Sequence, residues 1–229
     1  MTNVNKANSN PWLDIPLADY EGHMALPHVA QASLLADLFG ALLRELQPDS
    51  VAVLGCAGGN GLDRIDPAAT SRVVGVDINP LYVEATRTRH QGRFAQLEAI
   101  CADVERRRCL YEPVALAWAA LLFEYVDAFA TINRIAPLVG PEGVLATVVQ
   151  EPSEEVSFVT PSPYASLEAL SSAHRHVAPA RLASLAAGQG LYEMRRQRVS
   201  SAGGKAFVLQ VFRRDEEVVA DDDSQERAF

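Results

Sequence analysis

Long apolar runs, a secretory signal pattern and cysteine pairs are all missing from this sequence. No apolar run approaches the ~18 residues needed to span a membrane. The first residues do not show a basic stretch followed by an apolar one, so no signal peptide is expected. The three cysteines have no C-x-x-C spacing, which disfavours both a disulfide framework and a zinc site. We therefore expect a cytoplasmic protein with no membrane contact and no bound metal.

Basic charge is also scarce. The sequence has 20 lysines and arginines against 29 aspartates and glutamates, a formal net charge of −9. Much of the excess acid lies in residues 215–229, so the remainder is mildly acidic and offers no basic face to nucleic acid. The short arginine clusters at 106–108 and 195–198 are interpreted as solvated loop and strand-edge residues. No nucleic-acid partner is expected.

The composition is otherwise that of a folded protein. With 48% hydrophobic and 21% charged residues, a chain of 229 residues can bury the core of one domain with appendages. Residues 1–10 are polar and aperiodic and residues 215–229 are acidic, so a disordered leader and a disordered tail are predicted. A single domain is predicted over 11–214.

Apolar runs alternate with amphipathic segments through the first two thirds of that domain. Such alternation favours an α/β fold, with a mostly parallel sheet and helices on both faces. Two final runs around a Ser-Ala-Gly-Gly turn predict an antiparallel C-terminal hairpin that closes the sheet. The predicted strands are 51–54, 72–76, 97–101, 114–118, 144–149, 191–199 and 205–212, and the predicted helices are 34–46, 61–66, 80–87, 124–138, 166–173 and 179–187.

A glycine-rich turn follows the first predicted strand. Between Gly55 and Gly61 the residues are small or glycine, so the backbone can turn sharply and approach a ligand closely. The second predicted strand ends at Asp77, which lies 22 residues after Gly55. A glycine turn followed at this distance by an acid is the layout of a nucleotide-type site, in which the carboxylate binds ribose hydroxyls.

The turn does not match the dinucleotide fingerprint G-x-G-x-x-G. Counted from Gly55, the second position is Ala57 and the third is Asn60. A nicotinamide-dependent oxidoreductase is therefore disfavoured, although it stays open as an alternative function.

The run Leu54-Gly55-Cys56-Ala57-Gly58-Gly59 instead resembles motif I of the class I S-adenosylmethionine-dependent methyltransferases, L-G-C-G-x-G. It departs from the family at Ala57, commonly glycine, and at Val53, acidic in many members. The resemblance implies a Rossmann-like fold, an S-adenosylmethionine cofactor with S-adenosylhomocysteine as product, and methyl transfer by in-line displacement. The N/D-P-P-Y/F turn of base amino-methyltransferases is absent at 119–122, which favours a small-molecule acceptor over nucleic acid.

The resemblance also implies a set of cofactor-binding residues. The turn would meet the amino-acid end of the cofactor, assisted by the N-terminus of the following helix. Asp77 would bind the ribose, and Asp103 would lie near the adenine amino group, although an aspartate there is also typical of a helix cap. Cys56 is interpreted as packing, with a nucleophilic role as the less favoured alternative. The cofactor-binding residues are predicted to be Gly55, Cys56, Ala57, Gly59, Asn60, Asp77, Ile78, Asp103, Val104 and Ala119.

Candidates for acid–base chemistry lie before and after this core. A thiolate or carboxylate acceptor needs no base, whereas a hydroxyl or amine does, and the candidates are His23, Tyr20 and Glu124. For His23 and Tyr20 a purely structural hydrogen bond is the competing interpretation. Residues 11–47 are predicted to form an N-terminal lid and helix, with 11–27 covering the cofactor.

An insertion at 152–178 follows the fifth predicted strand. Two roles remain open for it, substrate specificity over the pocket or a contact in a homodimer. His174 and His176 lack a third ligand nearby and are interpreted as loop or helix surface. Since no acid–base group is assured, a methyltransferase-like binding protein without catalysis also remains an alternative.

Overall fold

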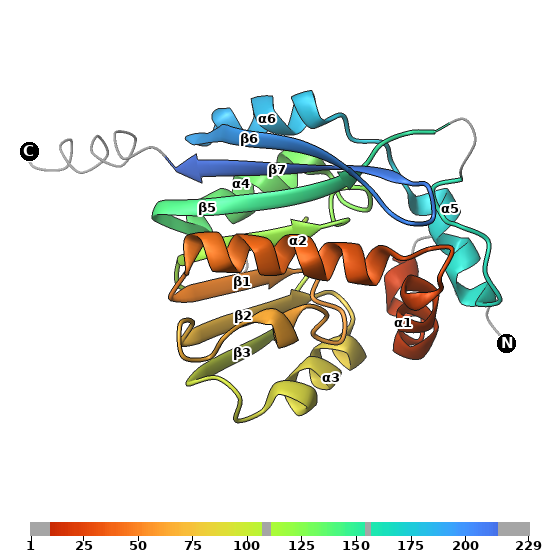
Figure 1. Cartoon of the computed structure of the whole chain (residues 1–229), viewed down its shortest axis with the longest axis horizontal. Coiled ribbons are helices and arrows are strands. Elements are labelled where there is room, and N and C mark those ends of the chain that lie inside the picture. The colour runs from red at the N-terminus through yellow and green to blue at the C-terminus, as the bar shows by residue number, and fades with distance from the viewer. Residues whose placement is uncertain (1–9, 107–110, 154–156, 215–229) are drawn as a thin grey trace, which may run out of the picture.

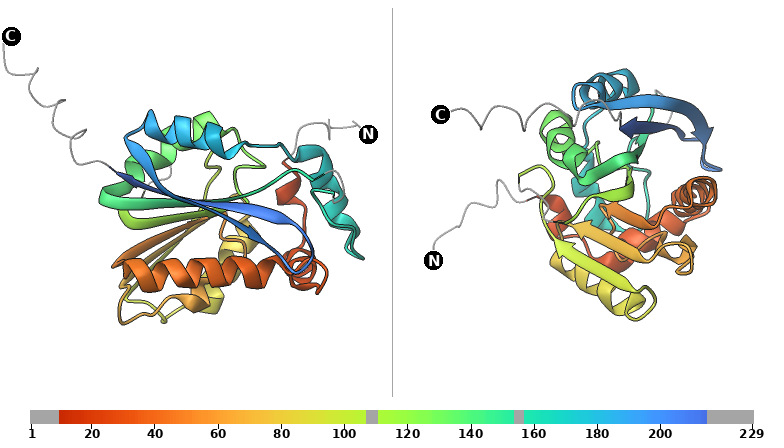
Figure 2. Two further views of the ribbon diagram at one scale, coloured as in Figure 1. Left: turned by 45° about the horizontal axis from the view of Figure 1, so that its top comes forward. Right: turned by 90° about the vertical axis from the view of Figure 1, so that its left-hand side faces the viewer.

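The fold is built on a seven-stranded sheet with helices on both faces (Figures 1 and 2). The structure, a computed structural model of the whole chain, describes residues 10–106, 111–153 and 157–214. The strand order is β3-β2-β1-β4-β5-β7-β6, with β1 to β5 parallel and β7 antiparallel to both neighbours. The strands are β1 (Ser50–Leu54), β2 (Arg72–Asp77), β3 (Gln96–Cys101), β4 (Val114–Ala120), β5 (Val139–Gln150), β6 (Leu191–Ser200) and β7 (Ala206–Arg214).

Six α-helices accompany the sheet within the described residues. Successive residues of a strand point to opposite faces, so β1 contributes to two cores. Val51 and Val53 pack with α2 on one face, whereas Ala52 and Leu54 belong to the cluster that includes α4 and α6 on the other. The helices are α1 (Leu17–Ala25), α2 (Gln31–Leu46), α3 (Pro80–His90), α4 (Ala128–Ile135), α5 (Leu170–Ala173) and α6 (Pro179–Ala187). None of these helices is long and apolar enough to cross a membrane.

The predicted mixed sheet and its C-terminal hairpin are confirmed, but several boundaries differ. The helix predicted from Glu124 begins at residue 128, because the Asp127 side chain caps it by accepting a hydrogen bond from the Ala130 amide at 2.7 Å. The fifth strand starts at Val139 instead of residue 144, because Val139 pairs with Val114 before a register shift. The helix predicted over 166–173 is a 3₁₀ turn (165–169) followed by the short α5.

The helix predicted over 61–66 is reduced to a 3₁₀ turn at Leu62–Arg64. Gly59 and Gly61 adopt positive φ angles of 88° and 84°, which a regular helix does not accept. The glycine turn is thus followed by three helical residues and then by a loop that leads into β2.

The N-terminal segment lies at the end of the sheet where the parallel strands finish, beside the segment that carries α5 (Figures 1 and 2). The Asn79 side chain donates from Nδ2 to the Trp12 carbonyl at 2.8 Å, and the Tyr82 hydroxyl donates to the Ile15 carbonyl at 3.0 Å. Ser166 donates to Asp19 at 2.6 Å, joining α1 to the insertion. The helix α1 is not among the predicted elements. The predicted disordered tail (215–229) and residues 1–9 of the predicted leader (1–10) lie outside the described residues. Asn10, the last residue of that leader, is described, and its side chain accepts a hydrogen bond from the Trp12 amide at 3.1 Å.

Candidate active site

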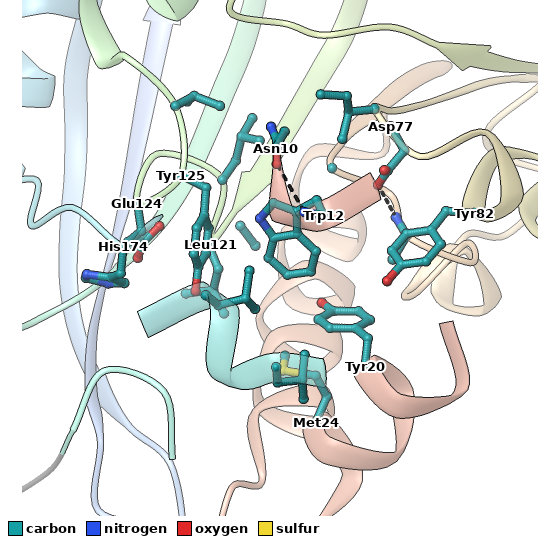
Figure 3. A pocket seen from close by; sticks show the side chains of 18 of the residues that line it. Asn10, Trp12, Tyr20, Met24, Asp77, Tyr82, Leu121, Glu124, Tyr125 and His174 are labelled. Carbon is teal, nitrogen blue, oxygen red and sulfur yellow. Dashed lines mark hydrogen bonds between the residues drawn. The ribbon is translucent and has the colours of Figure 1, made fainter. Parts of the chain in front are cut away.

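One large cavity opens where the strand order reverses, between the carboxyl ends of β1 and β4 (Figure 3). Open parallel sheets bind their ligands at this position. The cavity and its mouth hold about 1090 Å³, and the walls come from the ends of β1 to β5, from α1, and from the insertion. Segments distant in sequence therefore meet at a single site.

Asp77 lies at one end of this cavity. Its carboxylate is 8% exposed and accepts hydrogen bonds from the backbone amides of Ala57 at 2.8 Å and Asn79 at 2.9 Å. Burial raises the pKa of Asp77, and these amides oppose the rise. A carboxylate offers about four acceptor positions, and the backbone amides of Ala57, Ile78 and Asn79 do not use all of them, so Asp77 can also accept from a ribose hydroxyl.

The glycine turn wraps around this carboxylate. Gly55 and Ala57 both have positive φ angles, 74° and 48°, and only this bend points the Ala57 amide at Asp77. Alanine at such an angle carries strain that glycine would not. Because a three-residue 3₁₀ turn follows, the predicted assistance from a helix N-terminus is not found.

The predicted cofactor residues divide between two cavities. Gly55, Ala57 and Asp77 line the first, as do Ile78, Asp103 and Val104. Gly59 and Asn60 line a second cavity of about 1080 Å³, between the turn and α2. The two cavities share Tyr20, Met24, Gly55 and Ala120.

Two predicted cofactor residues line neither of these cavities. Cys56 is 1% exposed, and its Sγ lies 3.6 Å from the Thr86 hydroxyl. Burial raises the pKa of this thiol to about 12, so the packing interpretation fits and a thiolate nucleophile does not. Ala119 is fully buried within β4, and the following Ala120 and Leu121 line the first cavity instead.

Asp103 combines both interpretations made from the sequence. It lines the cavity, and one of its oxygens accepts a hydrogen bond from the Glu105 amide at 2.9 Å. Its other oxygen lies 3.6 Å from Nε of Arg106. The residue therefore caps a turn locally while facing the site.

The three acid–base candidates, Tyr20, His23 and Glu124, all line the same cavity. Glu124 is 2% exposed, and its Oε1 accepts a hydrogen bond from the Gln150 amide at 2.7 Å. Its Oε2 is buried without a hydrogen-bond partner among the residues that the structure describes. Burial raises the pKa of Glu124 to about 7, the range in which a carboxylate can accept a proton and release it again.

Tyr20 and His23 differ from Glu124 in their electrostatics. Burial, followed by the nearby charge of Asp77, raises the pKa of Tyr20 above its ordinary value, so a tyrosinate is disfavoured. Burial, followed by Lys205 and His28, lowers the pKa of His23. The Nδ1 of His23 is buried and has no hydrogen-bond partner within the described part of the chain.

Among the aromatic side chains that bridge the cavity, the sequence singled out Tyr20 but not Trp12 or Tyr125. Trp12 lies between Asp77 and Tyr82 on one side and Tyr125 on the other (Figure 3). Its ring meets Tyr20 edge-on at 5.5 Å and Tyr125 edge-on at 5.1 Å, measured between centroids. Trp12 stood out only as an apolar residue in a short segment between prolines, which does not reveal the site it joins.

His174 lies in the loop after α5, as predicted, but it faces the cavity and not the outer surface. His174 lines the cavity, its ring stacks on Phe158 at a centroid distance of 3.8 Å, and its Nε2 is buried without a partner in the described ranges. Burial lowers its pKa to about 4, so the ring is neutral near pH 7. His176 is exposed, and no cluster of three potential metal ligands occurs among the described residues.

Together these features define a Rossmann-like protein with a nucleoside-type site at the switch point of its sheet. Residues 51–143 match the family model of a methyltransferase domain. The predicted resemblance to the class I S-adenosylmethionine-dependent methyltransferases is confirmed. No protein with a curated function matches the sequence significantly.

Solved structures share this fold over most of the chain. Magnesium protoporphyrin IX methyltransferase (ChlM) from Synechocystis PCC 6803, with bound S-adenosylmethionine, has a TM-score of 0.64 at 13% identity, covering 93% of this chain and 100% of that one. N-methyltransferase NodS from Bradyrhizobium japonicum WM9, with S-adenosylhomocysteine, has a TM-score of 0.58 at 19% identity, covering 92% and 94%. The (4+2)-cyclase SpnF has a TM-score of 0.61 at 12% identity, covering 81% and 82%. At such identities the likeness establishes the fold, and the predicted fold class is confirmed.

Proposed function

We propose that this protein transfers the methyl group of S-adenosylmethionine to a small-molecule acceptor. The observation that carries the proposal is the continuity of one cavity from Asp77 to Glu124 (Figure 3). A carboxylate suited to ribose hydroxyls lies at one end, and a buried carboxylate with a free oxygen lies at the other. Such a cavity suits methyl transfer, because the cofactor and the acceptor must meet in one water-poor space.

The cofactor would take the end of the cavity formed by β1, β2 and β3. Asp77 would hold the ribose, with Ile78, Asp103 and Val104 along the adenine and the glycine turn beside the amino-acid moiety. The structures of ChlM and NodS contain S-adenosylmethionine and S-adenosylhomocysteine respectively, which supports this choice of cofactor. The sulfonium supplies an activated methyl carbon, and this chain supplies alignment and the exclusion of water.

Glu124 is the acid–base candidate that the geometry favours. The carboxylate is held by the Gln150 amide through Oε1, which leaves Oε2 for an acceptor. His23 and Tyr20 also face the cavity. Burial disfavours the tyrosinate form of Tyr20, so we assign Tyr20 to shaping the site. The lowered pKa of His23 keeps its ring neutral, the form that accepts a proton, so His23 is a second candidate base.

Other parts of the proposal rest on the sequence. The cytoplasmic location, the absence of a nucleic-acid partner, the homodimer contact and the division into leader, domain 11–214 and acidic tail remain predictions. The insertion at 152–178 contributes Phe158, Leu167 and His174 to the cavity, which supports its role in specificity.

Calorimetric titration with S-adenosylmethionine and S-adenosylhomocysteine tests the proposal. We expect micromolar binding that Asp77→Asn weakens by about 1–3 kcal/mol, because the amide places a donor against the backbone amides that the carboxylate now accepts. Asp14→Asn, an exposed acid outside the cavity, is the matched control. Failure of both ligands to bind would contradict the proposal, and binding of NADH instead would favour the oxidoreductase.

A second function is favoured by one of the structural neighbours. SpnF has this fold and is a cyclase, so the fold also carries chemistry other than methyl transfer. Tight binding of S-adenosylmethionine without turnover on any acceptor would indicate a methyltransferase-like protein of that kind, or a binding protein.

A further inference from the structure

We propose that the acceptor is an amine, which enters as an ammonium ion between aromatic side chains and is held by Oε2 of Glu124. The inference rests on the proposed function and names the substrate class of the same site. It follows from the partners of Glu124, the rings around it and the charges of its neighbours.

The carboxylate of Glu124 is fixed and incompletely satisfied. Its Oε1 accepts from the Gln150 amide at 2.7 Å, and its backbone carbonyl accepts from the Arg175 amide at 2.8 Å. These two hydrogen bonds hold Glu124 between β5 and the insertion. Glu124 is 2% exposed, and its Oε2 has no partner in the part of the chain that the structure describes. A buried carboxylate oxygen of this kind is costly unless a ligand supplies a donor or a positive charge.

Aromatic side chains surround this end of the cavity. Tyr125 meets Trp12 edge-on on one side and His174 edge-on at 5.8 Å on the other, and His174 stacks on Phe158. Figure 3 shows Tyr125 between Trp12 on one side and Glu124 and His174 on the other. Ring faces attract cations, and a group of rings beside a carboxylate is the usual chemistry for binding an ammonium ion.

The neighbouring titratable groups do not neutralise Glu124. Burial lowers the pKa of both His174 and His23, so both rings are neutral near pH 7. Lys205 is 3% exposed and donates to the carbonyl of Phe158, and burial lowers its pKa to about 8. Besides burial, the influences on the pKa of Glu124 are backbone hydrogen bonds of Gln150 and of Glu124 itself. The remaining carboxylates of the lining, Asp77 and Asp103, belong to the cofactor end.

Methyl transfer to an amine can be written with every proton and electron pair accounted for. Glu124 takes one proton from the ammonium, and the freed nitrogen lone pair attacks the methyl carbon of the sulfonium. A nitrogen–carbon bond forms, and the carbon–sulfur bond breaks with its electron pair going to sulfur, which leaves neutral S-adenosylhomocysteine and a methylated ammonium. The proton on Glu124 then returns to solvent.

Other acceptors fit less well. A carboxylate with a pKa of about 7 is a weak base toward an aliphatic hydroxyl, whereas an ammonium with a pKa near that of lysine, about 10, lies within a few units. A thiolate would meet the negative charge of Glu124 and needs no base. A buried unpaired carboxylate therefore favours an amine over both.

Binding of matched probes to the protein saturated with S-adenosylhomocysteine tests the inference. Phenethylamine and phenethyl alcohol have similar shapes and differ in charge. At pH 8 we expect the amine to bind at least about tenfold more tightly than the alcohol, because it gains a charge-assisted hydrogen bond at Glu124. In Glu124→Gln the preference should disappear. The control Glu168→Gln alters an exposed carboxylate outside the lining and should keep the preference.

A pH series provides a second readout. Between pH 6 and pH 7 the amine and Lys205 both stay charged while Glu124 ionises, so the affinity for the amine should rise in the wild type and stay flat in Glu124→Gln. Equal binding of amine and alcohol, or a preference that survives in Glu124→Gln, would overturn the inference. Absence of S-adenosylhomocysteine binding in the first step would instead overturn the proposed cofactor, so the two failures are distinguishable.

Discussion

Replacement of Glu124 by glutamine should stabilise the protein without ligand at alkaline pH. The pKa of this carboxyl is raised by burial from 4.5 to about 7. One pKa unit corresponds to about 1.4 kcal/mol, so ionising this group in the folded state costs about 3 kcal/mol at pH 8. Glutamine keeps an acceptor for the Gln150 amide and removes the charge. The net gain should be about 2 kcal/mol, because the new amide donor is itself left unpaired.

The sign of the pH dependence follows from proton linkage. Between pH 4.5 and pH 7 the folded state holds a proton on Glu124 that the unfolded state has released, so stability falls as pH rises. His23 and His174 have lowered pKa values and act in the opposite direction. The stability that they contribute to the folded protein is lost as pH falls below about 6.5. The difference between variant and wild type cancels these histidine contributions.

Urea denaturation at pH 5 and pH 8 measures this difference. At pH 5 the free energies of unfolding of Glu124→Gln and wild type should nearly coincide, whereas at pH 8 the variant should unfold at a urea concentration about 1 M higher. The exposed control Glu168→Gln should track the wild type at both pH values. A difference of the same size at pH 5 and pH 8, or a less stable variant at pH 8, would refute an unpaired buried carboxylate at this position.

Three further predictions concern the lid and the glycine turn. Tyr82→Phe removes the hydroxyl that donates to the Ile15 carbonyl and should lower the free energy of unfolding by about 0.5–1.5 kcal/mol. Limited proteolysis should then cut the N-terminal segment faster. An unchanged rate of proteolysis would contradict docking of that segment through this hydrogen bond. Ala57→Gly relieves a positive φ of 48° and should raise thermal stability by up to about 1 kcal/mol, whereas Ala57→Val should lower it. Glu21→Gln breaks the partly exposed ion pair between α1 and Arg89 and should lower the free energy of unfolding by about 0.2–1 kcal/mol. In 1 M salt this difference should vanish, because salt screens the pair. A difference that does not depend on salt would contradict the ion pair as its cause.

Local patterns were sufficient to predict most of the sheet and helices. The leucines spaced by four residues predicted the long helix that became α2, and the segment from Pro179 to Ala187 became α6 with the same bounds. Such periodicity indicates which face of a segment is apolar. That face packs on the sheet, so the helix can be predicted without knowing its tertiary contacts. The final hairpin was predictable for the same reason, because its Ser-Ala-Gly-Gly turn is local.

Remote contacts decided the boundaries that were wrong. Glu124 and Asp127 are both acids at the start of an amphipathic run, and either can begin a helix. Tertiary structure selected Asp127, because the backbone of Glu124 is held by the Arg175 amide and its carboxylate by the Gln150 amide. The sequence named Glu124 as an acid–base candidate, but neither partner lies near it in the sequence, so no local pattern could show how its two oxygens are satisfied.

The sequence by itself determined the cofactor end of the site. A glycine turn after one strand and an acid at the end of the next are fixed in position by chain connectivity, and the structure joins them through the hydrogen bond from the Ala57 amide to Asp77. Only the tertiary structure decided how the proposed acceptor end is assembled, where Trp12 from the N-terminal segment and Phe158 and His174 from the insertion line the same cavity as Glu124. The physical reason is that burial, which shifts the pKa of Glu124 and leaves Oε2 unpaired, depends on what packs around a side chain and not on its neighbours in sequence.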